Sequence, residues 1–163
     1  SILISNDETF ARAVAAEVER QLGVLPRQAI ARASWQSHGA IILVKDFSAT
    51  PALVDRIAPE HLQLCLADPK PIADRVRHAG AIFLGAHTPE AIGDYVGGPN
   101  HVLPTSRSAR FSSGLGVVDF MKRTTILGCT REALSALGES AATLADAEGL
   151  DAHARSIRIR LNA

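Results

Sequence analysis

The segment Ala81-Ile82-Phe83-Leu84-Gly85 decides the fold, because it is a short apolar run that is followed closely by a helix-start signal, Thr88-Pro89-Glu90. An apolar run of this length without polar alternation is typical of a strand covered on both faces. Proline just inside a helix start is favoured, and the helix predicted here ends near Tyr95. A strand that leads directly into a helix predicts a parallel sheet wherever the unit repeats.

The same unit recurs on the N-terminal side. Apolar runs at residues 1–5, 39–44 and 62–66 predict three more buried strands. Helices are predicted between them by apolar spacing and capping residues. The first helix is marked by Phe10, Val14, Val18 and Leu22, and the second covers residues 27–36. The third carries Leu53, Val54 and Ile57 and ends before Pro59. The fourth begins at Asp68-Pro69 and runs toward Gly80. We therefore predict an α/β fold, an incomplete Rossmann-like and mostly parallel sheet with helices on both faces.

The composition changes after Phe111, where the hinge-like stretch 112–116 begins. A last short strand is predicted at 124–127. Two helices follow, marked by Leu134, Leu137, Ala141 and Leu144 and by Leu150, Ala154, Ile157 and Leu161. The prediction is an α/β domain at residues 1–111 and a helical tail at 112–163. A tail of about fifty residues is too small for a core of its own, so we expect it to bury its apolar faces on a second subunit.

The composition limits the classes of protein to which the chain can belong. The 163 residues include 17 basic and 17 acidic side chains, and 47% of the residues are hydrophobic. This balance is that of a soluble globular protein, and it offers no basic face for nucleic acid. No apolar run approaches the length of a membrane span, and no signal peptide is recognisable. Cys65 and Cys129 lie in apolar stretches, which predicts buried free thiols and a cytoplasmic protein.

Asp94 and His101 lie within a segment rich in glycine and proline, Gly93–Thr105. Glycines let the backbone approach a ligand closely, and prolines limit the path between them. The segment therefore suits a site that holds a carboxylate and an imidazole beside a small molecule. A surface turn with a capping Asp and an incidental His uses the same residue types, and both interpretations stay open.

A second carboxylate–imidazole pair, Glu60 and His61, follows Pro59 and precedes an apolar run. Adjacent side chains of a regular strand point to opposite faces, so the two share a site only at an irregular strand start. Imidazole suits proton transfer near neutral pH. The alternative is a solvated Glu beside a surface His.

Metal and cofactor signals are incomplete in the sequence. Asp94, His101 and His153 offer the oxygen and nitrogen atoms that zinc prefers, but their spacing does not choose among them. No Gly-x-Gly-x-x-Gly motif occurs. We therefore expect any nicotinamide cofactor to be held mainly by residues outside this sequence.

Several motifs resemble those of the histidinol dehydrogenases, and the resemblance covers the whole chain. They are Ala58–Leu62, Thr88–Tyr95, Gly98–Thr105, Ala109–Ser113, Val118–Arg123 and Glu148–His153. The resemblance implies the C-terminal part of such an enzyme, without its N-terminal region and its second nucleotide-binding-like domain. The region expected to be absent includes a Gln and a His that the family uses as metal ligands.

The resemblance also implies an activity, the zinc- and NAD-dependent oxidation of L-histidinol through L-histidinal to L-histidine, the last step of histidine biosynthesis. It implies that Glu60 and His61 are the acid–base pair. His61 would take a proton as hydride leaves the alcohol carbon, and Glu60 would help to activate water in the later step.

The same resemblance assigns Asp94 and His153 to the metal, and His101 and Glu148 to the substrate. His61, Asp94 and His153 would contact the substrate as well. We expect a homodimer with shared active sites, because the tail carries two of these residues.

Two alternatives stay open. One is a related zinc alcohol dehydrogenase for another small polyol or amino alcohol. The match of His101 and Glu148 to substrate contacts of the histidinol enzymes argues against it. The other is a non-catalytic dimerisation or metal-binding module, an interpretation that applies to the 163 residues in isolation. We expect these residues by themselves to be inactive as a dehydrogenase.

Overall fold

A computed structural model describes residues 1–161 and divides the chain into two compact units. The first unit comprises residues 1–120, and the second begins at Met121. The first unit thus runs past Phe111, and the domain boundary drawn there stays a prediction. No helix within residues 1–161 combines the length and the apolar character that a membrane crossing requires.

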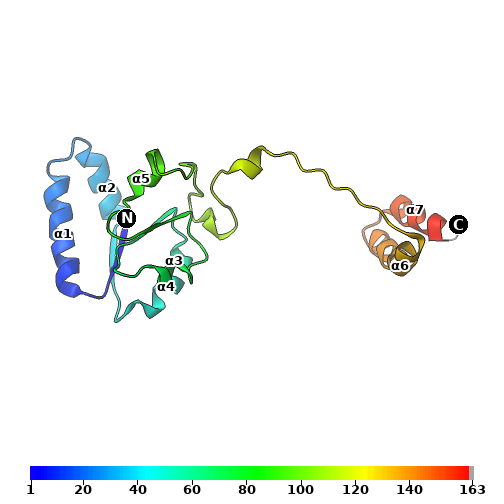
Figure 1. Cartoon of the computed structure of the whole chain (residues 1–163), viewed down its shortest axis with the longest axis horizontal. Helices are drawn as coiled ribbons and strands as arrows, with labels where there is room; N and C mark the ends of the chain where they lie inside the picture. Colours follow the sequence, from blue (N-terminus) through cyan, green and yellow to red (C-terminus); the bar gives the residue numbers. More distant parts are fainter. Residues whose placement is uncertain (162–163) are drawn as a thin grey trace. The chain divides into compact units, whose positions relative to one another are not determined.

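The first unit alternates strands with helices, as predicted (Figure 1). Its strands are β1 (Ile2–Ser5), β2 (Ala40–Leu43), β3 (His61–Leu64) and β4 (Ala81–Leu84). Its α-helices are α1 (Glu8–Leu22), α2 (Gln28–His38), α3 (Thr50–Ile57), α4 (Lys70–Ala73) and α5 (Glu90–Tyr95). Short 3-10 helices lie at η1 (Phe47–Ala49), η2 (Ser108–Arg110) and η3 (Val117–Phe120).

The strands pair in parallel, which confirms the predicted α/β class. β1 pairs with β2, and β3 pairs with β4 so that His61 lies opposite Ala81. Within the described residues these are two separate two-stranded sheets and not one continuous sheet. Each pair is linked through helices, as parallel strands require. The register of the second pair places His61 at the amino end of β3.

Local sequence explains where the helices begin and end. Asp7 caps α1 by accepting a hydrogen bond of 2.9 Å from the Phe10 amide. α3 ends at Ile57, and Ala58 takes a left-handed conformation (φ 50°) directly before Pro59. This turn delivers Glu60 and His61 to β3.

α4 is shorter than predicted and does not approach Gly80. It stops at Ala73 because the Asp55 carboxylate captures the amide hydrogens of Arg77 and His78, at 2.8 and 2.9 Å. Those two amides therefore do not extend the helix.

The strands are only partly covered, which corrects the prediction of fully buried strands. Ile2, Leu43 and Leu84 are 40–50% exposed, whereas Phe83 is 6% exposed. A pair of four-residue strands has two open edges, so short helices cannot cover it completely.

Cys65 and Cys129 are free, as predicted, but both are exposed, so their predicted burial is wrong. Cys65 directly follows β3, and Cys129 lies in an extended segment before the next helix.

The second unit is a pair of helices, α6 (Arg131–Ala147) and α7 (Asp151–Leu161). They pack through small side chains, because Ala142, Ala145 and Ala154 are buried and Ile157 packs against them. Leu137 and Leu144, two members of the predicted apolar stripe, are instead 64% and 67% exposed. The helices were predicted correctly, but Leu137 and Leu144 do not form the contact between them, whereas Leu161 of α7 packs against Gly138 of α6.

The strand predicted at 124–127 is wrong, because residues 121–130 have no regular structure. Ile126 is 93% exposed, and no strand of the described chain pairs with this segment. The stretch 112–116 is also less hinge-like than predicted, since the Leu115 amide donates to the Val102 carbonyl at 2.9 Å.

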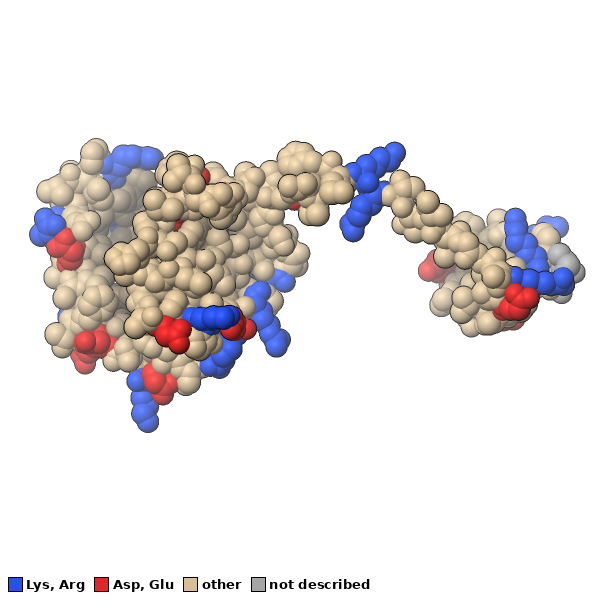
Figure 2. All heavy atoms as spheres, viewed as in Figure 1, with Lys and Arg blue, Asp and Glu red and all other residues tan. Residues whose placement is uncertain are grey.

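Acidic and basic side chains are interspersed on the visible surface of the first unit (Figure 2), in keeping with the zero net charge.

Candidate active site

Asp94 lies between two imidazoles in the first unit. Its Oδ1 atom is 3.4 Å from Nε2 of His61, and its Oδ2 atom is 3.2 Å from Nδ1 of His101. The Asp94 side chain is 12% exposed, whereas that of His101 is 68% exposed. Three residues predicted from two separate motifs are therefore brought together, one from β3, one from α5 and one from the loop that follows.

Glycines at the end of α5 allow this arrangement. Gly93 is buried against the ring of Phe83, where a β-carbon would overlap the ring. The helix then ends because the amides of Val96 and Gly97 both donate to the Ile92 carbonyl, at 3.1 and 2.6 Å. The Asn100 side chain accepts from the Val102 amide at 2.7 Å and turns the chain at His101.

The His61 ring is held by packing. It stacks on Phe83 with ring centroids 6.0 Å apart and planes at 29°. Its side chain is 22% exposed, yet Nε2 is buried and has no hydrogen-bond partner within residues 1–161. A buried imidazole nitrogen without a partner is expected to meet a group that this chain does not itself provide.

Glu60 lies one residue before β3 and is half-buried. Its carbonyl accepts from the Ala81 amide at 2.9 Å, and the Pro59 carbonyl accepts from Gly80 at 3.0 Å. A β-carbon on Gly80 would lie 2.5 Å from the Glu60 carbonyl, so the two backbones are in close contact. The chain bends at Glu60 before β3 begins at His61, and a site shared by the two side chains stays a prediction.

Glu90 was missed by the sequence interpretation. Its Oε1 atom lies 3.9 Å from Nδ1 of His61. His61, Glu90 and Asp94 each offer one ligand atom, and these atoms lie within 4.8 Å of one another. The available signal was the spacing of Glu90 and Asp94, which are four residues apart on one helix and so share a face.

This donor set fits part of a zinc site. Zinc in proteins is bound by imidazole nitrogen and carboxylate oxygen, and His61, Glu90 and Asp94 supply both. The unpartnered Nε2 atom of His61 faces the Asp94 carboxylate. The arrangement can therefore hold a cation or a ligand nitrogen and can move a proton through an imidazole.

Glu148 and His153 belong to the second unit, and their part in the site stays a prediction. Glu148 is the C-cap of α6, where its amide donates to the Leu144 carbonyl at 3.0 Å. Gly149 (φ 73°) makes the turn into α7, and His153 is exposed in the first turn of that helix. The turn between the helices therefore presents both residues on the surface of the second unit.

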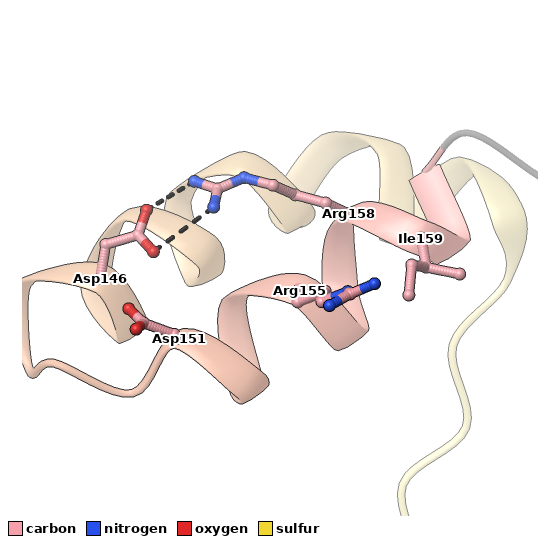
Figure 3. Close-up of a pocket in the computed structure, with 5 residues that line it drawn as sticks. All are labelled: Asp146, Asp151, Arg155, Arg158 and Ile159. Carbon is pink, nitrogen blue, oxygen red and sulfur yellow. Dashed lines mark hydrogen bonds and ion pairs between the residues drawn. The ribbon is translucent and has the colours of Figure 1, made fainter.

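An ion pair joins the two helices near this turn (Figure 3). Arg158 donates to both carboxylate oxygens of Asp146, at 2.6 and 3.4 Å. The hydrogen bond lowers the pKa of Asp146 and raises the pKa of Arg158. The pair lines an open hollow with Asp151, Arg155 and Ile159. The two residues belong to different helices, so sequence spacing carried no signal for their pairing.

Comparisons with known proteins agree on one family. The family model described as histidinol dehydrogenase matches residues 1–161. The histidinol dehydrogenase of Rhodospirillum rubrum is 64% identical over 163 residues, which are 99% of this chain and 38% of that protein. The histidinol dehydrogenase of Nitrobacter winogradskyi is also 64% identical, over 162 residues, and again 38% of its length is matched.

A solved structure is similar as well. The crystal structure of histidinol dehydrogenase from Elizabethkingia anophelis superimposes with a TM-score of 0.77 and 34% sequence identity. The match covers 99% of this chain and 37% of that one. The chain thus spans somewhat more than a third of the length of the relatives that it matches.

Proposed function

The chain belongs to the histidinol dehydrogenase family, and from that premise we propose that the protein containing it oxidises L-histidinol to L-histidine through L-histidinal. The reaction would be the last step of histidine biosynthesis, with NAD as the hydride acceptor and zinc in the site. The observation that carries the proposal is the position of Asp94 between His61 and His101. One carboxylate and two imidazoles from separate segments suit a site that grips and deprotonates a small polar alcohol.

In the first oxidation His61 is the base. Its imidazole is placed to accept the hydroxyl proton of the alcohol, and NAD, when bound, would supply the hydride acceptor. Stacking on Phe83 limits the orientations of the ring. The Nε2 atom has no hydrogen-bond partner in the described chain and so has a lone pair or a proton to exchange.

In the second oxidation Glu60 is the base. Conversion of the aldehyde to the carboxylate requires the oxygen of a water molecule, and a second NAD would supply the oxidant. Glu60 would accept a proton from that water, on the same substrate carbon from which His61 starts the first oxidation. Its backbone bond to Ala81 supports this position.

Asp94 and His153 would hold the zinc ion, and His101 and Glu148 would contact the substrate. When bound, zinc supplies a positive centre that grips the imidazole and amine nitrogens of histidinol and orients them. Asp94 belongs to a group of possible metal ligands with His61 and Glu90, which supports its own part of this assignment.

A homodimer with shared sites is part of the proposal. Leu137, Leu144, Ile126 and Leu127 are each more than 60% exposed, so the second unit leaves an apolar surface uncovered. Surfaces of this kind mark protein–protein contacts. A second subunit would cover this surface and would bring Glu148 and His153 to a site. The proposed compartment is the cytoplasm.

The test is turnover by the full-length protein that contains this chain. We expect NADH formation from L-histidinol, two NADH for each histidine formed, and little formation from simple diols or other amino alcohols. Preference for a different amino alcohol would favour the related dehydrogenase over this proposal. The 163 residues by themselves should give no steady turnover and should bind zinc weakly, because Asp94 and one His make too few ligands for a closed site.

A further inference from the structure

We propose that Glu90 is a positioning residue for His61. Its carboxylate accepts the Nδ1 proton of the imidazole and so keeps Nε2 free to receive the proton of the substrate. This inference rests on the proposed role of His61 as the base in the first oxidation.

The two nitrogens of His61 face two different carboxylates. Nδ1 lies 3.9 Å from Oε1 of Glu90, and Nε2 lies 3.4 Å from Oδ1 of Asp94. Both acids come from α5, one helical turn apart, so the helix presents them along the edge of a single ring. The ring is meanwhile stacked on Phe83, with ring centroids 6.0 Å apart.

The gap between Nδ1 and Glu90 is longer than a hydrogen bond, and a small movement closes it. The Glu90 side chain is 52% exposed, which leaves it room to change rotamer, and a hydrogen bond to Nδ1 needs a distance of about 3 Å.

A neutral imidazole carries one hydrogen, and the partner of one nitrogen decides the state of the other. With Glu90 accepting from Nδ1, the lone pair remains on Nε2. That atom is the buried one without a hydrogen-bond partner in the described chain. A carboxylate that orients a catalytic imidazole in this way is a recurring device in hydrolases.

Asp94 is less suited to this task. Its second oxygen lies 3.2 Å from Nδ1 of His101, and the proposed zinc site uses the same carboxylate. Glu90, in contrast, is not among the residues that the family resemblance assigns to the metal or the substrate. The alternative use of Glu90, as a direct metal ligand within the His61–Glu90–Asp94 group, predicts a different outcome in the same experiment.

The experiment compares Glu90→Ala, Glu90→Gln and the control Glu8→Gln in the full-length enzyme. Glu8 is an exposed helix residue that pairs only with Arg12 among the ion pairs found, and its change should leave activity unaltered. We expect Glu90→Ala to lower kcat about 10- to 100-fold with KM, zinc content and melting temperature close to the parent. Glu90→Gln should lose less, because its amide oxygen still accepts the Nδ1 hydrogen.

The decisive arm repeats Glu90→Ala in a His61→Asn background, where it should cause no further loss. A kcat within twofold of the parent for Glu90→Ala overturns the inference. If Glu90→Ala loses zinc together with kcat, Glu90 is a metal ligand and the inference is wrong. The inference is also wrong if Glu90→Ala lowers kcat further in the His61→Asn background. Full activity of His61→Asn alone would instead refute the proposed function, so the two failures are distinguishable.

Discussion

The Nε2 atom of His61 lies 3.4 Å from Oδ1 of Asp94, although His61 begins β3 and Asp94 lies near the end of α5. The contact arises because α5 folds back over β4, with Gly93 against Phe83. Ligands of open parallel sheets usually bind at the carboxyl ends of the strands. Here the candidate site lies at the amino end of β3 instead, so the general rule for such sheets would have misplaced it.

Substitutions of His61 and of Glu60 should impair different steps of the reaction. Positioned acid–base groups contribute about a hundred- to ten-thousand-fold in rate. His61→Asn in the full-length enzyme should lose turnover by a factor in this range and keep its zinc content. Glu60→Gln should impair oxidation of the aldehyde more than oxidation of the alcohol, since its task is water activation. Single-turnover rates with histidinol and with histidinal measure the two steps, and equal losses would reject this division.

Glu148 and His153 should act across the dimer, on the site of the other subunit. Mixing a His61→Asn subunit with a His153→Ala subunit then creates hybrid dimers with one doubly defective site and one intact site. About half of the dimers are hybrids, so mixing should restore about a quarter of normal activity. The measurement is histidinol oxidation after subunit exchange, which mass spectrometry of the dimers verifies. Activity that stays at the level of the separate mutants would exclude a shared site.

Gly93→Ala should destabilise the first unit and disturb the site. A β-carbon there overlaps the Phe83 ring, which is 6% exposed and has little room to move. Overpacking of this kind costs about 1–3 kcal/mol, against a helix-propensity gain for Ala of about 1 kcal/mol. We therefore expect a lower melting temperature, and a loss in kcat that reaches about 100-fold if Asp94 shifts by about 1 Å.

The matched control for this change is Gly128→Ala. Gly128 lies in the extended segment before α6, and a β-carbon there meets nothing within 4 Å. Its φ angle is not positive, so the new side chain introduces no backbone strain. Its melting temperature should equal that of the parent, and an equal loss in both variants would contradict the steric explanation.

Asp146→Asn should reduce the acid sensitivity of the second unit. The hydrogen bond from Arg158 lowers the pKa of Asp146 in the folded state, so the pair stabilises the fold above the unfolded pKa of about 4. That contribution is lost as the pH falls through the lower, folded value. Thermal unfolding at pH 7 and pH 3 should therefore differ less for Asp146→Asn than for the parent. The pair is exposed, so the effect should be small and should shrink in high salt.

The exposed loop residue Asp68 provides the control for this prediction. Asp68→Asn removes the same charge without removing a bond between α6 and α7. It should leave the pH dependence of unfolding at the parent value. If both variants change the acid response equally, net charge and not the Arg158 contact would explain it.

Residue patterns alone predicted most of the helices and all four strands of the first unit. The fourfold spacing from Phe10 to Leu22 located α1 to within a few residues. Such signals are local, because they depend on periodicity and on hydrogen bonds between near neighbours. The same reasoning failed at 124–127, where an apolar pair suggested a strand, because a strand also needs a neighbour with which to pair.

For the candidate site, the sequence by itself determined which residue types were available and in which motifs they lay. Glu60, His61, Asp94 and His101 were named from their motifs, whereas Glu90 was missed, because its four-residue spacing from Asp94 does not by itself show that both acids face His61. Only the tertiary structure decided that α5 folds back over β4, that Nε2 of His61 is buried without a partner, and that Asp94 lies between two imidazoles. The physical reason is that distances between side chains from different elements depend on packing, here of Gly93 on Phe83, and packing leaves no periodic signature in the chain.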